Sequence, residues 1–269
     1  MPYVSVKVSD GWGNQMFKVA AMLGYAERHG HTPVFLGEPA VCREHGASQL
    51  YIRDQFPDIP VIPQDPLETG TWTVLKEPAD ACFTYLDLPH MDGNVLLDGY
   101  FQSYKYLPTY SLPAPTMTPA VISLLAEDWT QSVFVHVRRG DFMHPANAHH
   151  RIDIIGYIRK CLLEVEADKK LFVVSDDMPW CKQELPKLLG EERAWIWCPE
   201  TLSDRDTIAL MSLCEGGICA NSTFSWWAAY FLTRVQDDTK VFMPQPWGKP
   251  PLPPVRDIYP PWCKIVDTI

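Results

Sequence analysis

The residues best suited to chemistry follow an apolar, strand-like stretch in the middle of the chain. Val133-Phe134-Val135 runs directly into His136, Arg138, Arg139 and Asp141. An arginine beside a core strand needs an anion or a carboxylate, because burying an unpaired charge is costly. Alternation along the strand places His136 and Arg138 on one face and Arg139 on the other. The pattern favours an anion site at the end of this strand, and salt bridges from both arginines between two lobes are the alternative.

A glycine-containing turn near the N-terminus lies between an apparent strand and a helix. Gly11-Trp12-Gly13-Asn14-Gln15 resembles a dinucleotide-binding turn, but Met16 stands where the third glycine belongs, so a NAD site is not expected. One interpretation is a tight turn whose glycines supply positive φ angles. The other is close approach of the backbone to a ligand, with Asn14 and Gln15 as amide donors at a helix N-terminus.

Two further polar turns follow later strand-like stretches. Ser175-Asp176-Asp177 predicts either capping of the next helix or a carboxylate that accepts two N–H bonds from a guanine edge. The turn after residue 220 combines small polar side chains with the N–H groups of a helix start, which suits a phosphate. Its members are Asn221, Ser222, Thr223 and Ser225.

Metal sites are not predicted. Asp204-Arg205-Asp206 has the D-x-D spacing of metal-dependent sugar transferases, but it precedes a helix and is interpreted as capping. The 8 cysteines include no C-x-x-C pair, which favours reduced core thiols over a zinc site. A net charge of −10 argues against broad contact with nucleic acid or anionic membrane.

Composition and patterning predict a soluble globular protein. Hydrophobic residues make up 46% and charged residues 21% of the 269-residue chain, which excludes a disordered chain. No apolar run reaches the roughly 18–20 residues of a membrane span. A strand-like segment starts almost at Met1, so no signal peptide is visible. We therefore expect a cytoplasmic location, although a chain trimmed of a Golgi-type anchor would look the same.

Strand and helix patterns alternate in both halves of the chain, and short apolar strands between helices predict parallel sheets covered on both faces. In the second half, strands are expected at 133–135, 171–174, 195–197, 217–220 and 241–243. Helices are expected at 152–166, 204–214 and 223–232, and a short helix is expected to follow Asp177 and to end at Leu189. In the first half, strands are expected at 4–8, 33–36 and 95–98, with a helix at 15–28 that Gly30 ends.

We therefore predict an α/β chain of two Rossmann-like lobes with a cleft between them and ligands at the carboxyl ends of the strands. The Pro-rich stretch 107–119 divides the chain into lobes 1–115 and 120–269, and the second lobe includes a Pro-rich tail. The stretch 40–90 is irregular, and no element is assigned to it.

Five segments in chain order resemble the successive motifs of the α-1,2-fucosyltransferases, glycosyltransferase family 11. They are Gly11-Trp12-Gly13-Asn14-Gln15-Met16-Phe17, Asp98-Gly99-Tyr100-Phe101-Gln102-Ser103, His136-Val137-Arg138-Arg139-Gly140-Asp141-Phe142, Phe172-Val173-Val174-Ser175-Asp176-Asp177 and Ala220-Asn221-Ser222-Thr223-Phe224-Ser225-Trp226-Trp227. The resemblance implies a GT-B fold with an acceptor-side first lobe and a second lobe that binds GDP-sugar. It also implies transfer of fucose from GDP-β-L-fucose to a galactose-terminated glycan, inversion at the anomeric carbon, and no metal or other cofactor.

The resemblance also implies roles for individual residues. Arg138 would contact the β-phosphate, His136 and Asp176 would flank the guanine, and Asn14 would reach from the first lobe toward the donor. The implied donor-binding set is Gly13, Asn14, His136, Arg138, Asp176, Asn221, Ser222, Thr223 and Ser225. The implied catalytic set is Arg138, Asp141 and Asn14.

The chemistry requires negative charge on the departing GDP to be met by Arg138 and by the helix start after residue 221. The acceptor proton needs a base, for which Asp141 is selected. The other candidates are Asp98, His144, His149 and His150. Asp141 orienting an arginine is the alternative. At the level of function, the alternatives are a transferase of another linkage, a transferase acting on a protein hydroxyl, and a non-catalytic protein that binds nucleotide sugars.

Overall fold

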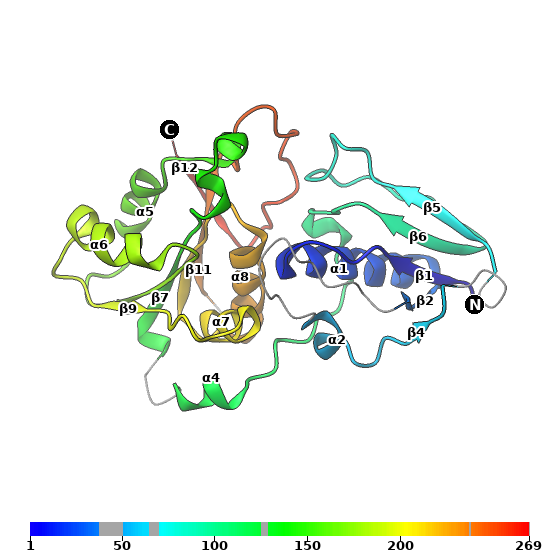
Figure 1. Cartoon of the computed structure of the whole chain (residues 1–269), viewed down its shortest axis with the longest axis horizontal. Coiled ribbons are helices and arrows are strands. Elements are labelled where there is room, and N and C mark those ends of the chain that lie inside the picture. The colour runs from blue at the N-terminus through cyan, green and yellow to red at the C-terminus, as the bar shows by residue number, and fades with distance from the viewer. Residues whose placement is uncertain (38–50, 65–69, 125–128, 237, 269) are drawn as a thin grey trace. The chain divides into compact units, whose positions relative to one another are not determined.

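The structure is a computed structural model that describes residues 1–37, 51–64, 70–124, 129–236 and 238–268 (Figure 1). It divides into two compact units. The first comprises Met1–Pro113 and Pro253–Pro260, and the second Ala114–Leu252 and Pro261–Ile269. The division falls inside the Pro-rich stretch 107–119. Each unit contains a parallel sheet with helices, so the prediction of an α/β chain is confirmed.

The tail is shared between the units, whereas the sequence assigns all of it to the second lobe. Residues 253–260 belong to the first unit. Asp257 accounts for this, because its carboxylate accepts the N–H of Tyr85 at 2.7 Å and its carbonyl accepts the N–H of Tyr104 at 3.0 Å. Lys105 adds an ion pair to the same carboxylate at 2.6 Å.

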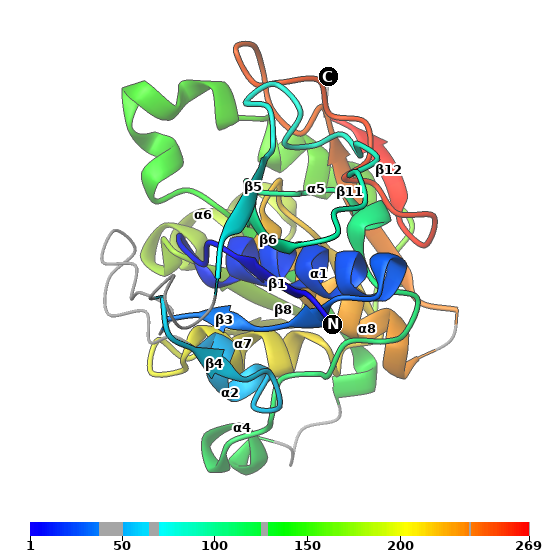
Figure 2. The same cartoon turned by 90° about the vertical axis from the view of Figure 1, so that its right-hand side faces the viewer.

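The first unit is built on a four-stranded parallel sheet in the order β2-β1-β6-β5. Its strands are β1 (Tyr3–Val6), β2 (Thr32–Pro33), β5 (Trp72–Lys76) and β6 (Asn94–Asp98). The long helix α1 (Trp12–His29) packs against β1 (Figure 2). The remaining elements are the paired strands β3 (Phe35–Leu36) and β4 (Val61–Ile62), the helix α2 (Tyr51–Gln55) and the 3-10 turn η1 (Tyr104–Tyr106).

Helix α1 forms because apolar residues recur along it at helical spacing, and Met16, Phe17 and Ala20 are fully buried. Gly30 ends the helix in the left-handed region with φ 72°, and its N–H donates to Ala26, as predicted. The interpretation that the glycines of the preceding turn supply positive φ angles is wrong for Gly11. Asp10 has φ 70°, whereas Gly11 has φ −66°.

The second unit contains a six-stranded parallel sheet in the order β12-β11-β10-β7-β8-β9. Its strands are β7 (Ser132–Val137), β8 (Lys170–Ser175), β9 (Trp195–Trp197), β10 (Gly216–Ile218), β11 (Lys240–Gln245) and β12 (Lys264–Asp267). Strand β12 has no counterpart in the sequence prediction. It is an edge strand whose residues are mostly exposed, so it lacks an apolar run.

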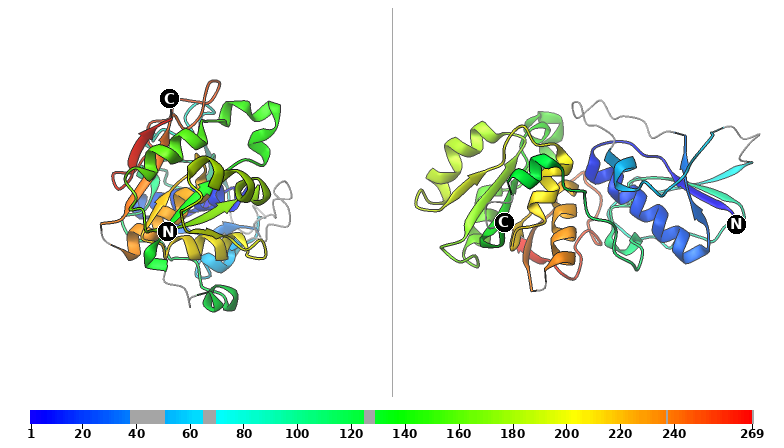
Figure 3. Two further views of the ribbon diagram at one scale, coloured as in Figure 1. Left: turned by 90° about the vertical axis from the view of Figure 1, so that its left-hand side faces the viewer. Right: turned by 90° about the horizontal axis from the view of Figure 1, so that it is seen from below.

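Helices cover both faces of this sheet, as the chain's strand–helix alternation predicts. They are α4 (Pro119–Ser123), α5 (Ile154–Leu162), α6 (Met178–Leu189), α7 (Asp204–Met211) and α8 (Thr223–Val235). Figure 3 shows α5 and α6 on one side of the sheet and α7 and α8 on the other. The 3-10 turns η2 (Trp129–Gln131), η3 (Asp141–Met143) and η4 (Pro145–His150) complete the unit.

The core of the second unit centres on β7, whose residues are all buried. Gly217 lies against the ring of Phe134, and a Cβ there would come within 2.1 Å of the ring. Trp226 and Trp227 of α8 are fully buried. The described cysteines are all free thiols, and most are buried, which confirms the prediction for them. Cys42 lies outside the described residues.

Candidate functional site

Three predicted site segments lie at one edge of the second sheet. Arg138 follows β7, Asp176 follows β8, and Asn221 comes three residues after the end of β10. Strands β10, β7 and β8 are neighbours and run parallel. Their carboxyl ends therefore share an edge, which is where ligands bind in open α/β sheets.

Two carboxylates hold the guanidinium of Arg138. Its Nη1 lies 2.8 Å from Oδ2 of Asp176, and its Nη2 lies 2.6 Å from Oδ1 of Asp141. The Phe142 ring centroid lies 5.5 Å from its Cζ. A guanidinium carries five N–H hydrogens in a rigid fork, so these two ion pairs do not exhaust its donors. With its side chain 27% exposed, Arg138 keeps a fixed cation at the edge of the sheet.

Asp176 connects Arg138 to the backbone of the following residue. While Oδ2 pairs with Arg138, Oδ1 accepts the N–H of Arg139 at 2.8 Å. This approach requires glycine at 140, because a Cβ there would come within 2.3 Å of Oδ2 of Asp176. Each Asp176 oxygen therefore already accepts one N–H from the protein, and contact with a guanine stays a prediction.

Arg139 has a different environment from Arg138. Its Nε lies 2.9 Å from Oδ2 of Asp177, and its Cζ lies 3.8 Å from the ring centroid of Trp180. Asp177 also caps α6 by accepting the N–H of Trp180 at 3.3 Å, as the capping interpretation predicts for this turn. Arg139 thus ties the end of β7 to the start of α6. Both arginines form salt bridges, and these partners lie within the second unit rather than between lobes.

His136 is a buried neutral imidazole on β7. It is 4% exposed, and its ring centroid lies 5.5 Å from that of Phe224, at the start of α8. Burial lowers the pKa of His136 to about 3, and the positive charge of Arg138 lowers it further in the same direction. Within the part of the chain that the structure describes, its Nδ1 has no hydrogen-bond partner. His136 is therefore uncharged near neutral pH, and its predicted place beside a guanine remains a prediction.

The polar side chains of the turn before α8 have different contacts. Ser222 is the N-cap of the helix and accepts the N–H of Phe224 at 3.3 Å. Ser225 is fully buried, and its Oγ lies 3.4 Å from the carbonyl oxygens of Ala220 and Ser222. The prediction that Ser225 belongs to a phosphate cradle is therefore wrong, because its hydroxyl points to backbone carbonyls. Ser222 and Thr223 are half-buried and keep the predicted cradle role as a prediction.

Asn221 links three segments of the second unit. Its Nδ2 donates to the carbonyl oxygen of His150 at 2.8 Å and to that of Trp247 at 2.7 Å. The residue is 5% exposed. Both amide hydrogens are committed to backbone carbonyls, so the side chain holds the loop of η3 and η4 and is not turned toward a phosphate.

The loop of η3 and η4 carries the candidate bases of the second unit. Phe142 stacks on His150 with ring centroids 4.7 Å apart, and His149 lies 4.2 Å from His150. Burial, followed by the charge of His149, lowers the pKa of His150. Asp141 is 42% exposed at its side chain and forms an ion pair with Arg138. This contact fits the orienting role that the sequence leaves open for Asp141.

Gly13, Asn14 and Gln15, which are predicted to approach a ligand, lie at the N-terminal turn of α1. Gly13 is buried, and Oδ1 of Asn14 accepts a hydrogen bond from Nε2 of Gln102 at 2.9 Å. The predicted ligand-donor role of Gln15 does not fit, because Gln15 is 3% exposed and its Nε2 donates to the carbonyl oxygen of Asp10. Asp98 pairs with Lys7 at 2.7 Å. The sequence gives Gln102 no role, although it lies in a quoted motif.

The D-x-D segment serves helix capping. Ser203 is the N-cap of α7 and accepts the N–H of Asp206 at 3.2 Å. The carboxylate of Asp206 in turn accepts the hydroxyl of Ser203 at 2.6 Å and that of Thr118 at 2.7 Å. Capping is therefore the interpretation that the geometry supports, with Ser203 rather than Asp204 as the cap.

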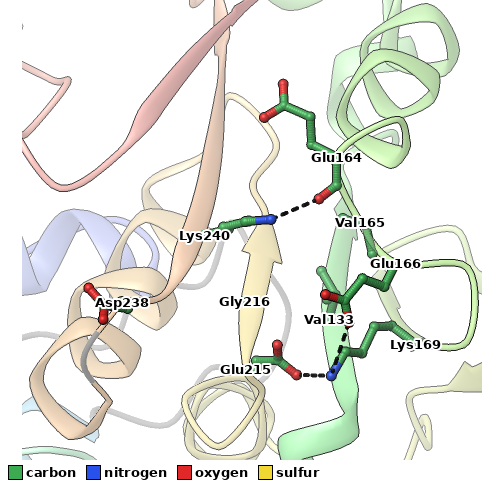
Figure 4. A pocket seen from close by; sticks show the side chains of 9 residues that line it. All are labelled: Val133, Glu164, Val165, Glu166, Lys169, Glu215, Gly216, Asp238 and Lys240. Carbon is green, nitrogen blue, oxygen red and sulfur yellow. Dashed lines mark hydrogen bonds and ion pairs between the residues drawn. The ribbon is translucent and has the colours of Figure 1, made fainter.

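A pocket of about 120 Å³ lies at the opposite edge of the second sheet (Figure 4). It is lined at the amino ends of β7, β10 and β11 by Val133, Gly216 and Lys240. Lys169 pairs there with Glu215 at 2.5 Å, and Nζ of Lys240 donates to the carbonyl oxygen of Glu164 at 3.2 Å. This pocket shares no residue with the predicted site.

Comparison with known proteins identifies the segment that contains most of the predicted site. Residues 120–247 match the model described as Glycosyl transferase family 11. These residues belong to glycosyltransferase family 11. The match confirms the family that the motifs indicate, and it contains the predicted site residues of the second unit.

Curated relatives carry related names. The chain is 29% identical over 173 residues to an α-1,2-colitosyltransferase of Escherichia coli, which covers 58% of this chain and 57% of that protein. It is 22% identical over 253 residues to a galactoside 2-α-L-fucosyltransferase of Caenorhabditis elegans, covering 85% and 69%. The match to the first of these relatives thus spans little more than half of its length.

Solved structures similar to the chain include two fucosyltransferases. The fucosyltransferase NodZ from Bradyrhizobium shares 16% identity at a TM-score of 0.48, covering 85% of this chain and 92% of that one. POFUT1 in complex with GDP-fucose shares 13% identity at a TM-score of 0.49, covering 89% and 96%. Separately, among the residues described, no helix has the length and apolar character needed to cross a membrane.

Proposed function

We propose that the chain transfers L-fucose from GDP-β-L-fucose to a hydroxyl of a sugar acceptor, with inversion at the anomeric carbon. The observation that carries the proposal is the guanidinium of Arg138, held by Asp141 and Asp176 at the carboxyl end of β7 within the family 11 segment. The relative named galactoside 2-α-L-fucosyltransferase supports a galactose-terminated acceptor and an α-1,2 linkage. We further propose the GT-B arrangement for the two units.

In the proposed reaction, the acceptor oxygen bonds to the anomeric carbon while the bond from that carbon to the β-phosphate oxygen breaks. GDP leaves with the bonding electron pair, and the acceptor proton passes to a base. Arg138, the N–H groups at the start of α8 and the hydroxyls of Ser222 and Thr223 meet the charge that develops on GDP. Fixed charges and dipoles in such positions supply roughly 3–4 kcal/mol per donor to the transition state.

The proton acceptor is chosen by what each side chain already contacts. Asp141 lies 2.6 Å from Arg138, so we propose that it orients the guanidinium. Asp98 is paired with Lys7. The histidines of the neighbouring loop, His144, His149 and His150, are then the proposed source of the base.

We also propose that transfer needs no metal ion. The carboxylates that follow β7 and β8 each bind an arginine: Asp141 and Asp176 bind Arg138, and Asp177 binds Arg139. Arginine is permanently charged and matches phosphate geometry with its forked donors. The guanidinium of Arg138 is therefore the cation that we propose for the diphosphate in place of a metal ion.

The relatives support a second donor. The first relative is named for colitose rather than fucose, so a colitose nucleotide is the alternative donor sugar. Transfer to another sugar position or to a protein hydroxyl is the alternative for the acceptor, and binding of a nucleotide sugar without catalysis is the alternative to enzymatic activity.

A panel of ligands and acceptors tests the proposal. Thermal unfolding is first measured with GDP, ADP, UDP and GDP-fucose, because a ligand that binds the folded state raises its stability. We expect GDP and GDP-fucose to raise Tm more than ADP or UDP. Transfer from GDP-fucose and from a colitose donor to galactosides is then followed with and without chelator, and the product linkage is determined. Equal shifts from all nucleotides, or activity lost on chelation, would contradict the proposal.

A further inference from the structure

Two side chains that are far apart in the sequence meet at the N-terminal turn of α1. Nε2 of Gln102 donates a hydrogen bond to Oδ1 of Asn14 at 2.9 Å, across 88 residues of chain. Gln102 is 7% exposed. The contact is therefore a partly buried link between the turn after β6 and the start of α1.

The direction of this hydrogen bond determines what Asn14 can offer. An asparagine amide has one acceptor oxygen and one donor nitrogen. Because Gln102 occupies Oδ1, the contact fixes the amide plane of Asn14 and sets Nδ2 as the end that serves other partners. The next amide in the turn is directed inward, since Nε2 of Gln15 donates to Asp10 at 2.7 Å. An amide donor at a helix N-terminus suits an anionic or oxygen-rich ligand.

A buried carboxylate holds the segment that carries Gln102. Glu77 is 6% exposed and accepts the N–H of Tyr100 at 2.6 Å and that of Phe101 at 3.0 Å. Phe101 has φ 52°, in the left-handed region that residues with a side chain rarely adopt. The N–H of Gln102 itself donates to Cys82 at 2.8 Å. These contacts fix the backbone that leads into Gln102, so its side chain reaches Asn14 from a preset position.

We propose that Gln102 is a positioning residue, whose amide donor orients Asn14 so that Nδ2 faces the donor substrate during transfer. This inference rests on the proposed function, because it concerns the Asn14 role in that reaction. It adds a residue that acts through Asn14 without touching the substrate.

The isosteric substitution Gln102→Glu tests the direction of the hydrogen bond. A carboxylate at position 102 can only accept hydrogen bonds, so Asn14 must rotate its amide and donate from Nδ2 to that carboxylate. We expect kcat at pH 8 to fall about tenfold, the effect of about 1.4 kcal/mol, while KM for the donor stays within about twofold. As pH falls to about 5.5 the buried carboxyl takes up a proton and donates again, so the loss shrinks.

Gln64→Glu is the matched control, because Nε2 of Gln64 also donates to a carbonyl, that of Leu36 at 3.0 Å, but is exposed. It should leave both kcat and the pH profile unchanged. Asn14→Asp supplies a second comparison. If Gln102 acts through Asn14, adding Gln102→Glu to the Asn14→Asp variant lowers kcat by less than about threefold further. An unaltered kcat in Gln102→Glu, a loss that is constant with pH, or additive losses would overturn the proposal.

A measurement that does not need activity separates this inference from the proposed function. The side-chain NH2 signals of Asn14 in an amide NMR spectrum are assigned by their loss in Asn14→Asp. We expect these signals to shift in Gln102→Glu and not in Gln64→Glu. If they stay in place, Gln102 does not set the Asn14 amide, whatever the assay shows. If they shift while the wild-type chain transfers no sugar, the proposed function fails and the Gln102–Asn14 geometry stands.

Discussion

Oδ2 of Asp176 lies 2.8 Å from Nη1 of Arg138, while Oδ1 of the same carboxylate accepts the N–H of Arg139 at 2.8 Å. One side chain at the end of β8 thus fixes both the guanidinium and the backbone at the end of β7. Asp141 holds the other terminal nitrogen of Arg138 at 2.6 Å. The cation proposed to stabilise departing GDP is therefore restrained before any substrate binds.

The two arginines should differ in what their loss changes. Arg138→Ala should lower kcat at least about a hundredfold, because one preorganised donor in the site is lost. Arg139→Ala should lower kcat less and reduce thermal stability, since its side chain stacks on Trp180 and pairs with Asp177. Steady-state kinetics and Tm of both variants check this. Equal losses of kcat would show that the assignment of the two arginines is wrong.

Gly140 should be sensitive to a single added methyl group. A Cβ at this position would come within 2.3 Å of Oδ2 of Asp176 and push that carboxylate away from Arg138. We expect Gly140→Ala to lower kcat about tenfold through misplacement of the guanidinium. Gly93→Ala is the control, because no atom lies within 4 Å of a Cβ built there. Full activity in Gly140→Ala would mean that the ion pair does not position Arg138.

Asp141→Asn should separate the two roles that the sequence leaves open for this residue. If Asp141 orients Arg138, kcat falls and the pH dependence of the rate keeps its shape, because the proton acceptor is still present. We expect this result, given the 2.6 Å contact with Arg138. Loss of the acidic limb of the pH–rate profile in Asp141→Asn would instead identify Asp141 as the base, because a base must be deprotonated to act.

Asn221→Asp should destabilise the second unit. The substitution removes both donors from the carbonyl oxygens of His150 and Trp247 and places an acceptor against them. We expect the free energy of unfolding to fall by about 2–4 kcal/mol. Asn147→Asp is the comparison, because its Nδ2 makes one exposed contact, to the carbonyl oxygen of Asp141. Urea unfolding of the two variants checks this, and equal effects would contradict the structural role of Asn221.

The stability of the second unit should fall as the solution becomes acidic, partly through His136. Burial lowers the pKa of this imidazole to about 3 in the folded state, so between pH 6.5 and 3 the unfolded state binds a proton that the folded state does not. The stability contributed by neutral His136 is therefore complete above pH 6.5 and is lost on acidification, at a limiting slope of about 1.4 kcal/mol per pH unit. Urea unfolding at pH 7 and pH 5 should show a smaller drop in His136→Gln than in the wild-type chain. An equal drop in both proteins would remove His136 as the cause.

The positions of the site residues along the chain could be predicted because they follow from local patterns in the sequence. The apolar run that enters His136 and Arg138 predicts a core strand, and parallel strands bring their carboxyl ends to one edge. This was enough to bring Arg138, Asp176 and Asn221 together. Gly30 likewise follows a helical pattern, and it adopts the left-handed conformation expected of a helix end.

Side-chain contacts between these segments were decided by tertiary structure. From its type and place, Asn221 suits a phosphate, yet both its amide hydrogens bind carbonyls from segments 71 and 26 residues away. Gln15 and Ser225 also turn inward, but their partners are backbone carbonyls close in the sequence, because a buried polar group takes the nearest available partner. The pairing of Gln102 with Asn14 needs the turn after β6 to pack against α1, and no spacing in the sequence records that contact. Residue types and strand order thus belong to the sequence, whereas the directions of the Asn221 and Gln102 side chains depend on which distant segments fold against them.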